Sequence, residues 1–208
     1  MKIVIFGASG MIGQRILAEA LHRGHQVTAV ARGTSKISSD AALTVRAADI
    51  QNEEQLSDIL QDQEVAINAT SPGADERAVV AVANSLIKAL SKKPKVRLVV
   101  VGGAGSLEVA PGLQLVDSAQ FPPAWKGIAL AHRDALDVYR KSDIDWTYVS
   151  PPMLIEPGDR TGTYREGADS LVTDDKGESR ISAEDYAVAL LDEIEEPAHR
   201  KARFTVGY

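Results

Sequence analysis

Cysteine is absent from this sequence of 208 residues, which excludes disulfide bonds, a thiol nucleophile and thiolate metal ligands. The four histidines, at positions 22, 25, 132 and 199, form no H-x-x-x-H or similar pair, so we predict no metal site. Basic residues form no block that would bind nucleic acid: 23 Lys and Arg oppose 29 Asp and Glu, a net charge of −6. No apolar run approaches the length that crosses a bilayer.

No signal peptide precedes the first predicted strand, so we expect a cytoplasmic protein that is a monomer or homodimer. Its expected partner is a small-molecule acceptor, with no nucleic acid and no membrane. Hydrophobic residues make up 44% of the chain and charged residues 25%, which are globular values. We expect one domain over residues 1–208, in which residues 151–208 contribute a small cap on the substrate side.

The N-terminal stretch combines a strand, a glycine-rich turn and a helix. Lys2–Phe6 is an apolar run that predicts a strand buried on both faces, and Gln14–Arg23 carries apolar residues at helical spacing. Glycines at 7, 10 and 13 have the spacing of a dinucleotide-binding turn, in which a pyrophosphate lies at the helix N-terminus. We therefore predict cofactor contacts from Gly7, Ser9, Gly10, Met11, Ile12 and Gly13.

Residues after the second and third predicted strands bear on which dinucleotide is bound. The second strand, His25–Ala31, is followed by Arg32, and no acidic residue occurs until Asp40. A carboxylate at this place would repel a 2′-phosphate, whereas a guanidinium forms paired hydrogen bonds with one. We predict NADP(H) as the preferred cofactor and NAD(H) as the alternative, unless Arg32 is a solvated loop residue. Asp49 is either an acceptor for the adenine amino group or a turn residue.

The order of the elements predicts an α/β fold: a Rossmann-like, doubly wound parallel sheet with helices on both faces. Strand and helix patterns alternate over residues 2–6, 14–23, 25–31, 43–48, 53–60, 64–69, 76–92, 97–101, 126–141 and 145–150. Ligands of such sheets bind at the carboxyl ends of the strands. We therefore predict further cofactor contacts where the fourth, fifth and sixth strands end, at Ala69, Thr70, Gly102, Gly103, Pro151 and Pro152.

The remaining segments are less regular. Residues 107–125 are predicted to form a long irregular segment, which in a compact domain is usually functional or mobile. Residues 151–158 are predicted to be extended but too rich in proline for a central strand. Leu171–Thr173 and Ser179–Ile181 flank an Asp-Asp-Lys-Gly turn and predict a hairpin. A helix and a last strand over 203–206 are expected to follow.

Several of these motifs resemble those of extended and atypical short-chain dehydrogenases, namely the glycine spacing, Asp49-Ile50 and Asn68-Ala69-Thr70. The tail is more specific. Pro157–Arg165 and Ile181–Ala187 are similar to the bacterial NADH-flavin reductase-like branch, which is similar to biliverdin reductase B, and the resemblance covers essentially the whole chain. It implies that Asp49 and Ile50 contact the adenine. It also implies a reductase that uses flavin as a substrate rather than as a tightly bound group.

The catalytic Tyr-x-x-x-Lys pair of ordinary short-chain dehydrogenases is absent, because no tyrosine is followed four positions later by lysine. Aligning the family's helix with Lys126–Lys141 places Ile128 at the tyrosine position and His132 at the lysine position. His132 is therefore the candidate catalytic residue, as a ligand of the nicotinamide ribose or as a proton donor. The alternative is a helix histidine bonded to a backbone carbonyl.

The missing pair limits the chemistry. Reducing a ketone creates an alkoxide, and the positioned acid that protonates it contributes about 10²–10⁴-fold. Flavin reduction lacks this demand, because the hydride adds at N5 and the charge spreads over the ring system. We predict an NAD(P)H-dependent oxidoreductase that reduces a flavin or a similar delocalised acceptor. Phe121, Pro122, Pro123 and Trp125 are candidates to wall the acceptor pocket, unless they only pack the loop.

Two other functions fit parts of this pattern. A non-catalytic NADP(H)-binding redox sensor fits the missing pair equally well. A sugar-nucleotide epimerase fits the glycine spacing but not the missing tyrosine and lysine.

Overall fold

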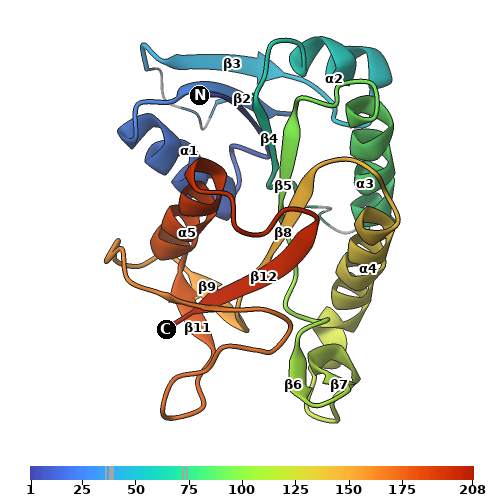
Figure 1. Cartoon of the computed structure of the whole chain (residues 1–208), viewed down its shortest axis with the longest axis vertical. Helices are drawn as coiled ribbons and strands as arrows, with labels where there is room; N and C mark the ends of the chain where they lie inside the picture. The colour runs from blue at the N-terminus through green and yellow to red at the C-terminus, as the bar shows by residue number, and fades with distance from the viewer. Residues whose placement is uncertain (36, 38–39, 72, 74) are drawn as a thin grey trace.

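The computed structural model describes residues 1–35, 37, 40–71, 73 and 75–208 (Figure 1). Its centre is an eight-stranded sheet in the order β10-β12-β8-β5-β4-β1-β2-β3. Every neighbouring pair is parallel except β10 with β12 at the edge. The strands are β1 (Lys2–Phe6), β2 (Gln26–Ala31), β3 (Leu43–Ala47), β4 (Val65–Asn68), β5 (Arg97–Val101), β8 (Trp146–Ser150), β10 (Arg165–Gly167) and β12 (Ala202–Gly207).

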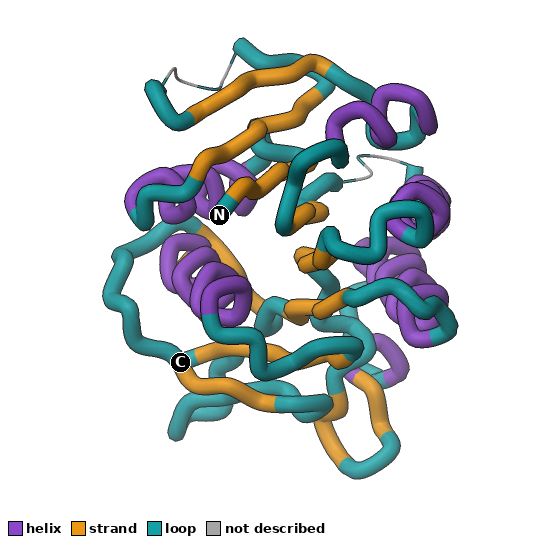
Figure 2. Tube along the Cα trace, turned by 45° about the horizontal axis from the view of Figure 1, so that its top comes forward, coloured by secondary structure: helices purple, strands orange, loops and turns teal. Residues whose placement is uncertain are grey.

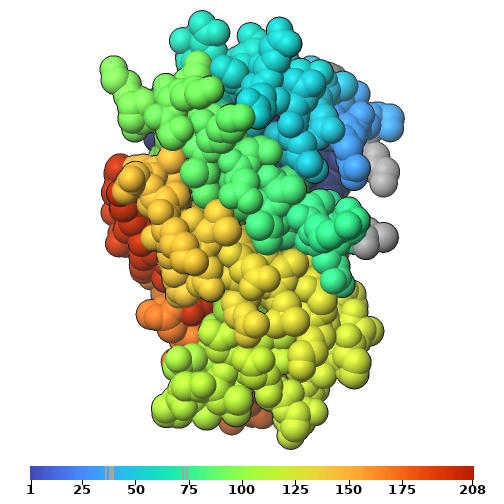
Figure 3. Space-filling view, turned by 90° about the vertical axis from the view of Figure 1, so that its right-hand side faces the viewer, coloured from blue at the N-terminus to red at the C-terminus, as the bar shows by residue number. Residues whose placement is uncertain are grey.

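Helices cover both faces of this sheet, as Figures 1 and 2 show. On one face α1 packs against α5, and on the other α3 packs against α4 and α2 (Figure 3). Their bounds are α1 (Met11–His22), α2 (Glu53–Ile59), α3 (Arg77–Leu90), α4 (Pro123–Arg140) and α5 (Ala183–Glu195). The predicted doubly wound α/β fold is confirmed.

Strand β1 shows why its sequence is apolar without alternation. Ile3 and Ile5 are buried in the core beneath α1 and α5, whereas Val4 and Phe6 are buried in the core beneath α2, α3 and α4. Both faces of a central parallel strand are covered by helices, so both sets of side chains must be apolar.

Three sequence predictions between residues 10 and 125 differ from the structure. Helix α1 begins at Met11 rather than Gln14, so residues 11–13 form its first turn. The segment predicted as irregular contains two short paired strands, β6 (Glu108–Ala110) and β7 (Leu113–Gln114), and a 3₁₀ turn, η1 (Leu115–Asp117). Helix α4 begins at Pro123 rather than Lys126, because proline is well suited to the first helical position, where no N–H partner is lost.

The predicted hairpin between 171–173 and 179–181 is wrong. Strand β11 (Arg180–Ser182) pairs in parallel with β9 (Leu154–Glu156), in a two-stranded sheet of its own. The turn itself exists, since the Asp174 carboxylate accepts hydrogen bonds from the N–H groups of Lys176 and Glu178. The turn signal was therefore correct, but the partner strand lies in the segment predicted to be extended.

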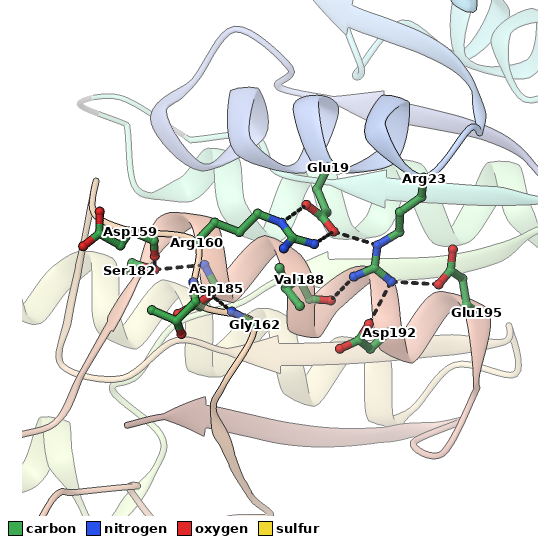
Figure 4. Close-up of polar contacts among 11 residues, drawn as sticks. Glu19, Arg23, Asp159, Arg160, Gly162, Ser182, Asp185, Val188, Asp192 and Glu195 are labelled. Carbon is green, nitrogen blue, oxygen red and sulfur yellow. Dashed lines mark hydrogen bonds and ion pairs between the residues drawn. The ribbon is translucent and has the colours of Figure 1, made fainter.

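The loop before β10 forms hydrogen bonds with both α1 and α5, and it belongs to one of the two segments, Pro157–Arg165 and Ile181–Ala187, that carry the family resemblance. Asp185 on α5 accepts hydrogen bonds of 2.8 Å from the N–H groups of Thr161 and Gly162. Arg160 pairs through two nitrogens with Glu19 on α1 (Figure 4). Arg23, also on α1, bonds Glu19 and reaches two carboxylates of α5, those of Asp192 and Glu195. These residues hold the glycine-turn helix in place without entering the site described next.

Candidate functional site

A cleft of about 280 Å³ opens at the carboxyl ends of β1, β2, β4 and β5 and extends between the sheet and helices α3 and α4. This is the edge at which parallel α/β sheets bind ligands. Nine predicted site residues line it: Gly7, Ser9, Gly10, Arg32, Asp49, Ile50, Ala69, Thr70 and His132. Seven others lie outside its lining: Met11, Ile12, Gly13, Gly102, Gly103, Pro151 and Pro152.

Close backbone contacts explain two of the three glycines. A Cβ on Gly7, whose φ is +80°, would lie 2.4 Å from the carbonyl oxygen of Ala69. A Cβ on Gly13 would lie 2.1 Å from the carbonyl oxygen of Gly7. At Gly10 the nearest atom, the carbonyl oxygen of Gly7, would be 3.3 Å away, a tight contact that a small shift would relieve. Gly10 is therefore the glycine whose role points to a ligand rather than to packing.

The start of helix α1 offers free backbone donors at this turn. Gly10 is its N-cap, no side chain caps it, and no acidic residue lies in its first turn. The N–H groups of residues 11–13 have no acceptor within the helix, and together with the helix dipole they favour an anion. The backbone N–H groups of Met11, Ile12 and Gly13 could therefore serve an anion, although none of the three residues lines the cleft, and their contact with the cofactor stays a prediction.

Arg32 and Asp49 line the same end of the cleft, where β2 and β3 end. Arg32 is exposed. The Asp49 carboxylate accepts a 2.9 Å hydrogen bond from the N–H of Gln51, which is the turn role considered for it. Its contact with adenine stays a prediction, as does that of Ile50.

Asn68 organises the turn after β4. Its side-chain oxygen accepts hydrogen bonds from the Thr70 hydroxyl at 2.7 Å and from the Thr70 N–H at 3.2 Å. Asn68 is buried and lines the cleft. It therefore fixes the predicted residues Ala69 and Thr70 at the edge of the cleft.

His132 lines the cleft from α4, opposite the end of β5. Burial lowers the pKa of its imidazole to about 4, so the ring is neutral at pH 7. Its Nδ1 lies 3.3 Å from the hydroxyl oxygen of Tyr148 on β8. The Tyr148 hydroxyl donates a 3.1 Å hydrogen bond to the backbone carbonyl of His132.

Gly102 and Gly103 lie directly against this pair. A Cβ on Gly102 would lie 2.0 Å from the Tyr148 ring, and one on Gly103 would lie 2.8 Å from Cβ of His132. The two glycines thus make room for the protein's own side chains. Their predicted contact with the nicotinamide stays a prediction.

The predicted walls of the acceptor pocket do not line this cleft. Pro122 and Pro123 form the N-cap and first residue of α4, and the Trp125 side chain is 64% exposed. Pro151 and Pro152 are buried directly after β8. Phe121 is likewise absent from the lining.

Five polar residues of the cleft were not among the predicted site residues: Gln51, Asn68, Ser71, Tyr139 and Tyr148. The Tyr-x-x-x-Lys pattern, which neither tyrosine fits, was the only sequence criterion for a catalytic tyrosine. Burial raises the pKa values of Tyr139 and Tyr148 above that of free tyrosine, and within the described part of the chain the Tyr139 hydroxyl has no hydrogen-bond partner. Tyr148 is the middle residue of β8 and Tyr139 lies on α4, and no sequence pattern singles out either residue.

The described residues contain no cluster of three or more His, Asp or Glu side chains that could hold a metal ion. Among the helices of those residues, none has the length and apolar character of a membrane span.

The family model described as NAD(P)H-binding matches residues 7–197. The chain belongs to this NAD(P)H-binding family. Within it, the chain is of the atypical short-chain dehydrogenase type that resembles NADH-flavin reductases, as its structural neighbours below indicate. The predicted family membership is confirmed, and with it the cofactor class, a nicotinamide dinucleotide.

Three solved structures are similar to this chain over its whole length. A protein of Burkholderia pseudomallei, provisionally described as exported, is 48% identical with a TM-score of 0.90 and is covered completely. A provisionally named epimerase of Bacteroides thetaiotaomicron is 40% identical with a TM-score of 0.94 and is 96% covered. A provisionally named NADH-flavin reductase of Streptococcus pneumoniae is 32% identical with a TM-score of 0.91 and is 99% covered. Because these names differ among members of similar fold, the side chains of the cleft must decide between activities.

Proposed function

We propose that the protein is an NADPH-dependent reductase of flavins or similar delocalised acceptors. The observation that carries this proposal is the combination of a dinucleotide turn with a cleft whose lining, among the described residues, contains no lysine to activate a tyrosine as an acid. A relative of 32% identity that bears the name of an NADH-flavin reductase supports it.

The cofactor end of the cleft supplies the binding groups. Free N–H groups at the start of α1 suit a pyrophosphate, and the open position at Gly10 allows its approach. Arg32 lines the cleft where the adenosine 2′-position is expected, and a guanidinium favours a 2′-phosphate there. We therefore propose NADPH as the preferred cofactor over NADH.

The polar side chains at the inner end of the cleft are weak proton donors, whereas ketone reduction requires a strong one. His132 is neutral at pH 7, and burial raises the pKa values of Tyr139 and Tyr148, so these hydroxyls resist losing their protons. In ordinary relatives a lysine lowers the pKa of the catalytic tyrosine, and no Tyr-x-x-x-Lys occurs here. When bound, NADPH supplies a hydride, and an acceptor that delocalises the resulting charge needs no acid beside it.

The direct experiment mixes protein, NADPH and FMN or riboflavin and follows nicotinamide absorbance, with a panel of small ketones and aldehydes as matched acceptors. We expect NADPH consumption with the flavins well above the uncatalysed rate and none with the ketones. Turnover of ketones alone would contradict the proposal.

A non-catalytic NADP(H) sensor is the second candidate, because a cleft without a catalytic acid suits a protein that binds its cofactor without using it. Tight NADPH binding without consumption on any acceptor, together with a protein that co-purifies with the chain, would favour the sensor.

A further inference from the structure

Tyr148 makes two contacts with one residue. Its hydroxyl oxygen is 3.1 Å from the carbonyl oxygen of His132 and 3.3 Å from Nδ1 of the same histidine. The tyrosine is almost completely buried on the central strand β8, between the sheet and α4. Both groups therefore meet away from bulk water, where unsatisfied polar atoms are costly.

These distances favour one position for the imidazole proton. A phenol has one hydrogen to donate, and at 3.1 Å the Tyr148 hydroxyl donates it to the His132 carbonyl. Nδ1 can then bond the same hydroxyl oxygen only by donating a hydrogen of its own. A neutral imidazole has a single N–H, so Nε2 is left without a proton.

The rest of the ring is constrained by its neighbours, and Nε2 is the ring nitrogen that Tyr148 does not contact. Nδ1 points at Tyr148, and a Cβ built on Gly103 would lie 3.4 Å from Cδ2, so that edge lies over the glycine. Among the residues that the structure describes, no hydrogen bond to Nε2 is found, and His132 as a residue is partly exposed. His132 itself lines the cleft.

We propose that Tyr148 is a positioning residue that holds His132 as the Nδ1–H tautomer, so that Nε2 presents a hydrogen-bond acceptor to a hydroxyl group of the bound nicotinamide cofactor. This role rests on the proposed function for the identity of the ligand. It gives Gly102 a reason to be glycine, because any Cβ there would collide with the Tyr148 ring.

The test compares two buried tyrosines of the same cleft. The variant Tyr148→Phe removes the hydroxyl that contacts His132. The variant Tyr139→Phe removes the hydroxyl of a neighbouring ring, whose centre lies 6.2 Å from that of Tyr148 and whose hydroxyl makes no hydrogen bond to His132 in the described structure. Nitrogen-15 NMR of the imidazole, assigned with His132→Gln, identifies the protonated nitrogen in each protein without cofactor.

We expect the wild-type protein and Tyr139→Phe to show a protonated Nδ1 and a bare Nε2, and Tyr148→Phe to lose this preference. A wild-type spectrum with the proton on Nε2 overturns the proposal, and this result does not depend on whether Tyr148→Phe folds. Unchanged tautomers in a folded Tyr148→Phe overturn it as well.

Calorimetric titration with NADPH tests the consequence for the cofactor. Loss of one oriented hydrogen bond should weaken binding about 2- to 10-fold in Tyr148→Phe. Equal affinities for NADPH in wild type and Tyr148→Phe would refute the acceptor role of Nε2. Failure of NADPH oxidation with flavins, alongside the expected spectrum, would instead refute the proposed reductase function and leave the tautomer assignment standing.

Discussion

Alanine at Gly13 and alanine at Gly10 are expected to separate stability from cofactor binding. A Cβ on Gly13 would meet only backbone atoms, 2.1 Å from the Gly7 carbonyl oxygen, 2.9 Å from its carbon and 3.1 Å from Cα of Ala8. Backbone cannot rotate away, so α1 must shift from β1. Overpacking of this kind lowers the free energy of unfolding by about 1–3 kcal/mol. The higher helix propensity of alanine offsets at most about 1 kcal/mol of this loss.

Gly10→Ala is the matched substitution at the neighbouring glycine. Its backbone angles, φ −76° and ψ 169°, are open to any residue, and its Cβ would lie no closer than 3.3 Å to another atom. We therefore expect the free energy of unfolding to change by less than about 1 kcal/mol. The added methyl group stands where a phosphate must approach the N–H groups of α1, so NADPH affinity should fall by at least about tenfold.

Urea unfolding and NADPH titration of the same two proteins measure both effects. Gly13→Ala should lose stability, and Gly10→Ala should lose affinity while keeping stability. Wild-type affinity in a folded Gly10→Ala would move the pyrophosphate away from this turn. Full stability in Gly13→Ala would show that the helix does not pack as closely as the structure has it.

Three further predictions concern charge. Arg32→Asp should weaken NADPH about 10- to 100-fold while NADH affinity changes little; equal effects in the two titrations would mean that Arg32 does not contact the 2′-phosphate. The imidazole of His132 stays neutral to about pH 4 in the folded protein, whereas it takes up a proton near pH 6.5 in the unfolded chain. Between pH 6.5 and pH 4 the free energy of unfolding of the wild type should therefore fall by about 2–3 kcal/mol more than that of His132→Gln. An equal fall in the two proteins, measured by urea unfolding, would refute this. Hydrogen bonds from Arg160, and then from Arg23, lower the pKa of Glu19 to about 2. Between pH 4.5 and pH 2 the free energy of unfolding of the wild type should therefore fall by up to about 3 kcal/mol more than that of Glu19→Gln. Equal losses in urea unfolding of the two proteins at each pH would refute this.

Local patterns were sufficient for the first half of the fold. The buried strand Lys2–Phe6, the three glycines and the helix after them interact within 25 residues of sequence, and the end of α1 follows from Gly24, whose φ is +79°. The alternation of strands and helices then leaves few topologies, because parallel crossovers share one hand. The doubly wound fold class could therefore be predicted, whereas the order of the strands comes from the structure.

Contacts between distant segments were beyond the same reasoning. Strand β11 looked like one arm of a hairpin because its turn is local, yet its partner β9 lies about 25 residues earlier. Gly102 and Gly103 were predicted to leave room for a cofactor, whereas their nearest neighbours are Tyr148 and His132. Nothing in the sequence shows which side chain fills the space beside a glycine.

The start of α4 shows a further limit of local patterns. Trp125 was a candidate to wall the acceptor pocket because an aromatic ring in a long loop suggests a flat binding surface. The structure places it on the first turn of a helix that begins at Pro123, outside the lining of the cleft. The proline pair was interpreted as a turn, although proline is equally suited to starting a helix.

The central claim is that NADPH bound at the Gly7–Gly13 turn reduces a flavin. Anaerobic stopped-flow reduction of FMN by NADPH tests it most directly, with wild type and Gly10→Val compared with a protein-free control. We expect wild type to accelerate the bleaching of the flavin, and Gly10→Val, folded but without bound cofactor, to match the control. Identical rates with and without the wild-type protein would contradict the claim.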